Sequence, residues 1–233
     1  DDAAAMAKPG VKLLDIAEHV ENKIRKRGAE PGFPLNLSLN DHAAHYTPKH
    51  KDEIAIKDGD ILKIDTGVHI DGYIADTAVT VQFGKHDQLV KASEEALSAA
   101  IDLIRPGRRI SDMSEKIEET IKSFGFVPIS NLMGHGLERF AIHTEPSIPN
   151  VKNSSPKTLE EDMVIAIEPF ATNGYGMVND VHECLIFEFS EEKPVRNQDA
   201  KKIISFIQRY GGTPFAERWL LSKEAVDFGL PNS

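Results

Sequence analysis

Apolar residues recur every three or four positions in two stretches of the chain. They are Leu13, Ile16, Val20 and Ile24 in the first stretch, and Ile110, Met113, Ile117 and Ile121 in the second. This spacing places each set on one face of an α-helix. Each stretch follows a Pro-Gly pair and precedes a glycine, Gly28 or Gly125, which suits the left-handed conformation that often ends a helix. The pattern therefore predicts two amphipathic helices, at residues 8–28 and 105–125.

These two stretches belong to an internal repeat. Residues 8–31 and 105–128 align without a gap at an offset of 97 residues. The matched pairs include Pro9 and Pro106, Asp15 and Asp112, Glu18 and Glu115, and Pro31 and Pro128. Two copies indicate a duplication rather than a solenoid, because stacked repeats generally need three or more units. We therefore expect two similar halves related by a pseudo-twofold axis.

The repeat also predicts the domain organisation. Residues 89–104 read as an amphipathic helix leading into the second copy, whereas only residues 3–7 correspond to it before the first copy. With Asp1 in place of an initiator methionine, this indicates a sequence that begins inside a longer protein. No linker rich in Pro, Gly or Ser divides the 233 residues, so we expect a single domain, 1–233. Its predicted parts are halves at about 1–86 and 87–187 and a helical insertion at about 192–230.

Residues 61–82 predict a long β-hairpin. Apolar and polar residues alternate around Asp71-Gly72, a dipeptide typical of the two-residue type I′ turn, and this turn pairs Gly67 with Asp76. One face then carries Leu62, Ile64, Val68, Ile70, Tyr73, Ala75, Val79 and Val81. We expect that face to be buried beneath helices. The overall prediction is an α+β fold with a curved antiparallel sheet and outer helices.

Two aspartates share the opposite face of this hairpin. Asp65 and Asp76 become diagonal neighbours, about 7–8 Å apart. Aspartate is disfavoured within strands, and both residues lie among β-branched neighbours. A divalent cation would explain the pair, because carboxylate oxygens on adjacent strands suit a hard or borderline ion. The alternative interpretation is a pair of solvated strand residues.

A carboxylate in the second half corresponds to the first of these aspartates. Residues 58–65 resemble residues 160–168 with one residue inserted, which makes Glu168 the counterpart of Asp65. Glu168 ends an apolar strand and is followed by Pro169. It is therefore a candidate for the same site, with a structural role as the alternative.

Histidines extend the candidate site. His135 lies between Gly134 and Gly136, which would let the backbone approach a neighbour closely. His143 follows eight residues later, and His45 falls near the corresponding position of the first half. A turn position is the alternative interpretation of His135.

Charge and cysteine content narrow the possible functions. A net charge of −10 opposes non-specific binding to nucleic acid, which needs clustered Lys and Arg. A single cysteine, Cys184, excludes an internal disulfide, suits a reducing compartment such as the cytoplasm, and is expected to be buried. No apolar stretch approaches the roughly 18 residues of a membrane helix.

In combination, these residues resemble the pita-bread metallopeptidase family, and most closely its archaeal and eukaryotic type II methionine aminopeptidases. The motifs that carry the resemblance are FPLNLSLNDHAAHYTP (33–48), KIDTGVHIDGYIADTAVTV (63–81), GHGLERFAIHTEP (134–146), AIEPFATNG (166–174) and YGGTPFAERWL (210–220). The steps from His135 to His143 and from His45 to Asp65 favour type II. The resemblance covers nearly the whole chain. It implies a pita-bread fold and metal-dependent removal of the amino-terminal methionine from nascent proteins and peptides.

The resemblance also implies roles for individual residues. Two divalent ions, Co, Mn, Fe or Zn, would be held by Asp65, Asp76, His135 and Glu168, with Asp76 bridging them. His45 would hydrogen-bond the substrate, and His143 would stabilise the tetrahedral intermediate. The methionine pocket would be formed by Phe33, Ile142 and Phe170, each of which also fits ordinary core. Tyr73 and Trp219 are assigned to packing.

The same resemblance limits the expected partners. These are peptides and nascent chains with an amino-terminal methionine, and the ribosome is a further candidate. Neither a membrane nor direct binding to nucleic acid is expected.

The chain departs from the family pattern in one respect. The family's fifth ligand is a glutamate on a late strand, and no such motif precedes Ser233. We therefore expect weak activity from this chain, with Glu183 considered as a substitute. Two alternatives stay open: a non-catalytic binding protein of the same fold, and a proline dipeptidase. The four candidate ligands argue against the first, and HAAHYTP and PFAERWL argue against the second.

Overall fold

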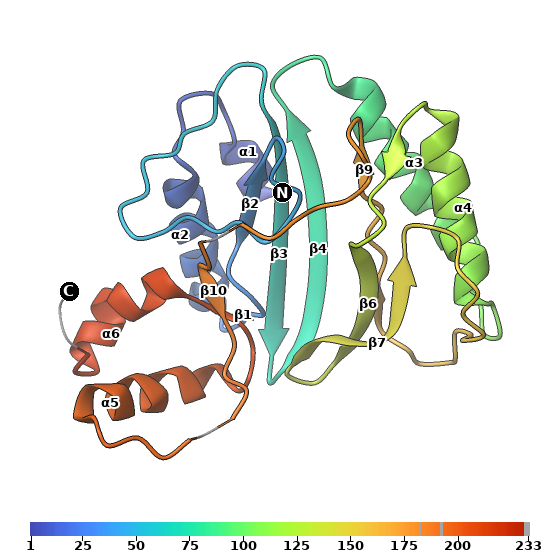
Figure 1. Cartoon of the computed structure of the whole chain (residues 1–233). Helices are drawn as coiled ribbons and strands as arrows, with labels where there is room; N and C mark the ends of the chain where they lie inside the picture. Colours follow the sequence, from blue (N-terminus) through green and yellow to red (C-terminus); the bar gives the residue numbers. More distant parts are fainter. Residues whose placement is uncertain (182, 192, 231–233) are drawn as a thin grey trace. The chain divides into compact units, whose positions relative to one another are not determined.

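The structure is a computed structural model that describes residues 1–181, 183–191 and 193–230 (Figure 1). It divides into two compact units. Unit 1 comprises Asp1–Gly84, Arg139–Ala141 and Val181–Ser233, and unit 2 comprises Lys85–Glu138 and Ile142–Asp180. The predicted domain and insertion include residues 182, 192 and 231–233, which lie outside the described residues. Every helix in the described part of the chain is too short or too polar to span a membrane.

Unit 1 combines helices with antiparallel strands. Its elements before residue 84 are α1 (Asp2–Met6), α2 (Leu13–Lys26), β1 (Glu30–Pro31), β2 (Asn36–Leu39), β3 (Ile61–Ile70) and β4 (Tyr73–Gln82). Strand β3 organises the sheet, because it pairs with β4 along its whole length. Its other edge pairs with β2 at Leu62–Asp65 and with β1 at Val68 and His69.

The core of unit 1 lies between α2 and one face of this sheet (Figure 1). Leu13 and Ile16 of α2 pack in one cluster with Leu62 and Ile64 of β3, and all four are at most 2% exposed. Side chains alternate across a strand, so Asp65 lies on the face that points away from α2. The predicted separation of an apolar and an acidic face is therefore confirmed at this end of the hairpin.

The hairpin register is as predicted, but its tip is not buried. Asp71 and Gly72 have φ values of 51° and 86°, as a type I′ turn requires, and Gly67 pairs with Asp76. Beyond the reach of α2, however, Ile70 is 63% exposed and Tyr73 is 71% exposed. Val79 on β4, which pairs with Ile64, is 46% exposed. The prediction of burial along the whole apolar face was wrong, because the cluster around α2 includes Leu62, Ile64 and Val81 but neither the tip nor Val79.

The C-terminal part of unit 1 forms a second core. Its elements are β10 (Ile186–Phe187), α5 (Gln198–Ile207), the 3-10 helix η1 (Gln208–Tyr210), β11 (Phe215–Ala216), the 3-10 helix η2 (Glu217–Leu221) and α6 (Lys223–Asp227). Strands β10 and β11 pair in antiparallel fashion. Phe206, Phe215 and Trp219 are buried together, so Trp219 serves packing as predicted. Cys184, expected to be buried, is exposed.

Unit 2 repeats the arrangement of a helix pair and short strands. Its elements are α3 (Asp87–Ile101), α4 (Ile110–Ser123), β5 (Val127–Pro128), β6 (Met133–Glu138), β7 (Ala141–Pro149), β8 (Ile165–Ala166) and β9 (Ala171–Thr172). Strand β6 lies between β7 and β8, and β5 pairs with β9. Ala96 and Ala100 of α3 pack against Ile117 and Ile121 of α4.

The predicted helix repeat is confirmed, residue for residue. Helices α2 and α4 have 14 residues each and start and end 97 positions apart. Gly28 and Gly125 follow them with φ values of 79° and 83°, as expected for left-handed helix ends. Both helices start five residues later than predicted, because Gly10 and Gly107 also have positive φ and form a turn before the helix.

The offset between the halves then changes to 103 residues. Pro31 pairs with Val68 in the first half, and Pro128 pairs with Ala171 in the second. At this offset Glu168 corresponds to Asp65, as predicted. Gly59 corresponds to Asp162, and both have positive φ. Residues 58–65 and 161–168 therefore align without the inserted residue that the sequence suggested, and the extra residues lie earlier, between Gly136 and Thr158.

Candidate functional site

Asp65 and Asp76 project from neighbouring strands of unit 1. Asp65 pairs with Ala78 and Asp76 pairs with Gly67, so the two aspartates are diagonal neighbours on one face. Both side chains are partly buried. The register of a two-residue turn determines this placement, since a shift by one residue would move either aspartate to the opposite face. The sequence prediction for these two residues is therefore confirmed in its geometry.

An aromatic ring borders the same face. Phe33, which is 7% exposed, lies so close to Gly67 that a Cβ atom at this position would overlap the ring. Gly67 has no positive φ, so glycine is required here for space rather than for backbone conformation. The ring of Phe33 consequently lies against the residue that pairs with Asp76.

In unit 2, His135 is held in the middle strand of a three-stranded sheet. It pairs with Ala166 of β8, and it is 7% exposed. A Cβ atom at Gly134 would overlap the carbonyl oxygen of Ala166, and one at Gly136 would overlap that of Glu145. The predicted close backbone approach at these glycines is therefore confirmed, with strands β8 and β7 as the neighbours. His135 lies in a strand, which excludes the turn interpretation.

The imidazole of His135 is oriented by two oxygen atoms. Its Nδ1 lies 3.0 Å from the carbonyl oxygen of Gly136, and its Nε2 lies 2.9 Å from Oε1 of Glu168. Both oxygens are acceptors, and the neutral ring carries one proton, so it can donate to only one of them. When Nδ1 carries that proton, Nε2 presents a lone pair toward Glu168. A cation bound there would be ligated by both Nε2 and Oε1, with the carbonyl of Gly136 orienting the ring, as hydrogen-bond partners of metal-ligating histidines do.

Glu168 reaches His135 because β8 ends two residues before it. The side chain of Glu168 is 30% exposed, and that of His135 is 9% exposed. An imidazole nitrogen with a carboxylate oxygen is a donor set that suits Zn, Fe, Co or Mn. These two residues therefore fit a metal ion on chemical grounds.

The remaining predicted residues lie on β7, after β8 and in the loop after β2. His143 is exposed on β7, and its ring centroid lies 4.6 Å from that of His135. Ile142 beside it is 6% exposed, and Phe170, two residues after Glu168, is half-buried. His45 is exposed on the loop after β2 of unit 1 and has a left-handed backbone, with φ of 60°.

Glu183, which the sequence suggested as a substitute metal ligand, forms an ion pair with Lys49. Its Oε1 lies 3.2 Å from Nζ of Lys49, and its side chain is 59% exposed. It is thus engaged in a surface ion pair of unit 1.

Sequence reasoning missed two buried polar groups of unit 1. His69 on β3 is 8% exposed and accepts a hydrogen bond from the backbone N–H of Gly72, at 3.2 Å. Burial lowers the pKa of His69, more than Glu30 and Asp71 raise it. The second group is Arg218, which is 6% exposed and paired with Glu21. An arginine next to Trp219 within an apolar segment was the available signal.

Comparison with known proteins identifies the family. A profile of the metallopeptidase family M24 matches residues 1–198. A methionine aminopeptidase of Archaeoglobus fulgidus is 50% identical over 228 residues, which cover 97% of this chain and 78% of the relative. A crystal structure of methionine aminopeptidase from Thermotoga maritima has a TM-score of 0.69 and 32% identity, covering 74% of each chain.

Similarity to a proline-specific member is weaker. The prolidase from Pyrococcus horikoshii OT3 has a TM-score of 0.61 and 26% identity, and the match covers 72% of this chain and 48% of that one. The fold is thus the pita-bread fold of these metallopeptidases. The chain belongs to metallopeptidase family M24 and, within it, to the methionine aminopeptidases of archaeal type.

Proposed function

We propose that this protein removes the amino-terminal methionine from peptides and nascent proteins in a metal-dependent reaction. The observation that carries the proposal is 50% identity to a methionine aminopeptidase over 97% of the chain. The lower identity and coverage of the prolidase match argue against a proline dipeptidase. The metal-ligand chemistry of His135 and Glu168 argues against a purely non-catalytic binding protein.

Four residues are proposed as the metal ligands. Asp65 and Asp76 come from one face of the β3–β4 hairpin, and His135 and Glu168 come from β6 and the residues after β8. In support, the first pair shares a strand face and the second pair is in contact through ligand atoms. Two ions are proposed, with Co, Mn, Fe and Zn as candidates and Asp76 as the bridging ligand. Bound ions would anchor the substrate's amino group, polarise the scissile carbonyl and lower the pKa of a water molecule.

The chain's own histidines take the remaining polar roles. His143 is exposed beside His135, where its imidazole is proposed to donate a hydrogen bond to the oxygen that becomes negative during attack on the carbonyl. His45 is proposed to hydrogen-bond the substrate near the scissile bond. Its exposure in the loop after β2 supports this role.

The methionine side chain is proposed to enter a pocket of Phe33, Ile142 and Phe170. An unbranched thioether favours aromatic and aliphatic neighbours. In support, the ring of Phe33 lies against Gly67, directly across from Asp76. An apolar ring beside an acid suits a substrate end that combines a hydrophobic side chain with an ammonium group.

The wider setting follows from the same proposal. A single cysteine is consistent with a reducing compartment, for which we infer the cytoplasm. Nascent chains would be presented by the ribosome, which is therefore a further candidate partner. We propose that the whole chain forms one catalytic domain, with halves near 1–86 and 87–187 and an added helical segment near 192–230.

Metal binding and peptide hydrolysis test the proposal together. Calorimetric titration with Mn or Co should show binding that Asp76→Ala and His135→Ala each abolish. Asp71→Asn is the matched control, because it removes a negative charge from the same hairpin and tolerates the left-handed φ of the turn. The protein should release methionine from Met-Ala-Ser and should not cleave an X-Pro dipeptide. Unchanged metal binding in both alanine variants, or preferential cleavage of the dipeptide, would overturn the assignment.

A further inference from the structure

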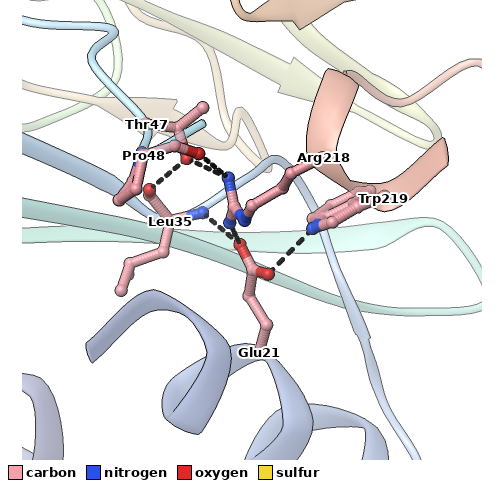
Figure 2. A network of polar contacts seen from close by, with 6 residues as sticks. All are labelled: Glu21, Leu35, Thr47, Pro48, Arg218 and Trp219. Carbon is pink, nitrogen blue, oxygen red and sulfur yellow. Dashed lines mark hydrogen bonds and ion pairs between the residues drawn. The ribbon is translucent and has the colours of Figure 1, made fainter. Parts of the chain in front are cut away.

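A buried polar network joins three distant segments of unit 1 (Figure 2). Glu21 lies on α2, Thr47 lies in the loop after β2, and Arg218 lies on η2. These residues are 3%, 0% and 6% exposed. Burial of an ion pair costs desolvation energy unless the remaining donors and acceptors are also satisfied, so such a pair is weak evidence for stability alone. The network is therefore a candidate for positioning the segments that it joins, in addition to any effect on stability.

The carboxylate of Glu21 binds three groups of the network. It forms an ion pair with Nη2 of Arg218. It also accepts hydrogen bonds from the backbone N–H of Leu35, at 3.0 Å, and from the indole N–H of Trp219, at 2.8 Å. Figure 2 shows Glu21 reaching from its helix to Leu35, Arg218 and Trp219. Helix α2, the residue before strand β2 and η2 are thereby joined at one carboxylate.

The guanidinium of Arg218 extends this connection to the loop. Its Nη1 donates to Oγ1 of Thr47, at 2.6 Å, and to the carbonyl of Pro48, at 3.0 Å. The hydroxyl of Thr47 donates in turn to the carbonyl of Leu35, at 2.9 Å. The planar guanidinium presents separate nitrogen atoms in fixed directions to Glu21 and to the loop, whereas lysine has one nitrogen for both.

Both ends of the network lie two residues from a proposed substrate-contacting residue. Leu35 follows Phe33, and Thr47 follows His45, each by two positions. His45 has a left-handed backbone, which is unfavourable for a residue other than glycine and must be imposed by its surroundings. The loop closes through the backbone hydrogen bond from Leu37 N–H to the carbonyl of Tyr46, at 2.7 Å. Arg218 anchors the backbone directly after this closure.

We propose that Arg218 is a positioning residue that holds the His45 loop in its active arrangement through Thr47 and Pro48. The helical segment that contains Arg218 thus contributes to the reaction without contacting the substrate. This inference rests on the proposed function, because His45 acquires its role there. It adds a role for a part of the chain to which no ligand or catalytic residue is assigned.

The test removes the contact between Arg218 and the Thr47 hydroxyl without changing its volume. Thr47→Val should lower kcat for Met-Ala-Ser about tenfold and leave KM within about twofold, because misplacement of a group that acts on the transition state reduces kcat. Thr47→Ser retains the hydroxyl and should restore kcat. Thr213→Val is the matched control: Thr213 is 1% exposed in the same C-terminal segment, and its hydroxyl donates to the carbonyl of Tyr210, within that segment. It should leave kcat unchanged.

A double-mutant cycle separates positioning from general stability. In a His45→Ala background, Thr47→Val should lower kcat by less than about twofold, because the residue that it positions is absent. If the loss of kcat in the double variant equals the product of the losses in the two single variants, the inference is overturned. An unchanged kcat in Thr47→Val would also overturn it. A parent protein that releases no methionine would instead overturn the proposed function. In that case hydrogen exchange of backbone amides tests the positioning role by itself. Arg218→Lys should accelerate exchange of the Leu37 amide hydrogen, which closes the loop, and an unchanged exchange rate would refute the positioning role.

Discussion

Nε2 of His135 lies 2.9 Å from Oε1 of Glu168, while Nδ1 of the same ring lies 3.0 Å from a backbone carbonyl oxygen. The ring is thus held between two acceptors. One proton can satisfy only one of them in the neutral imidazole. This arrangement is ready for a cation on the side of Glu168, and it leads to the first prediction.

Glu168→Gln should weaken metal binding and stabilise the metal-free protein. In the neutral ring with its proton on Nδ1, the amide nitrogen of glutamine can donate to Nε2 of His135, which replaces a contact between two acceptors by a hydrogen bond. Loss of one carboxylate ligand should reduce the affinity for Mn or Co by at least about tenfold, in the range seen for disturbed metal sites. Calorimetry measures the affinity, and thermal unfolding in a chelator measures the stability. An unchanged affinity would contradict a ligand role for Glu168.

Gly67→Ala should disturb the proposed methionine pocket. The added Cβ overlaps the ring of Phe33, so the ring must move. Overpacking of this kind costs about 1–3 kcal/mol of unfolding free energy. Because the displaced ring of Phe33 is part of the proposed methionine pocket, the KM for Met-Ala-Ser should also rise. Phe33→Leu in the same background vacates the space, and urea unfolding should then show recovered stability without recovered KM. Equal KM values for parent and Gly67→Ala would count against the pocket.

Two glycine substitutions should differ in cost for a structural reason. Gly136→Ala places a Cβ against the carbonyl oxygen of Glu145 on the adjacent strand, where neither backbone can yield. We expect a loss of more than about 2 kcal/mol. Gly10→Ala meets open space and is strained only by its φ of 89°, which costs about 1–2 kcal/mol. Denaturant unfolding of both variants provides the comparison, and a greater loss for Gly10→Ala would refute it.

Acid should weaken the fold partly through His69. Burial lowers the pKa of this histidine below its ordinary value of 6.5. As the pH falls below 6.5, the unfolded chain therefore binds the proton first, and the contribution of His69 to stability is lost progressively toward its folded pKa. His69→Asn keeps an acceptor for the N–H of Gly72 and should show a shallower loss of stability between pH 7.5 and 5.5. NMR titration of the ring should give a midpoint below 6.5; a higher midpoint would contradict the assignment.

Local sequence patterns predicted those features of the candidate site that lie within one hairpin or one strand. The register that places Asp65 and Asp76 on one face follows from Asp71-Gly72, because a two-residue turn leaves one pairing for the strands. The glycines around His135 were read correctly as positions of close approach. The orientation of the His135 ring toward Glu168 was not predictable, since it depends on strand β8, about 30 residues away, pairing beside β6.

The amino-acid sequence by itself determined the two 14-residue helices, their glycine ends and the hairpin turn, because each depends on residues within a few positions of one another. Only the tertiary structure decided the exposed hairpin tip at Ile70 and Tyr73, the exposure of Cys184 and the change of offset between the halves. It alone also brought Arg218 to Glu21, 197 positions away. Such contacts depend on how elements pack, and no periodicity along the chain records which surfaces will meet.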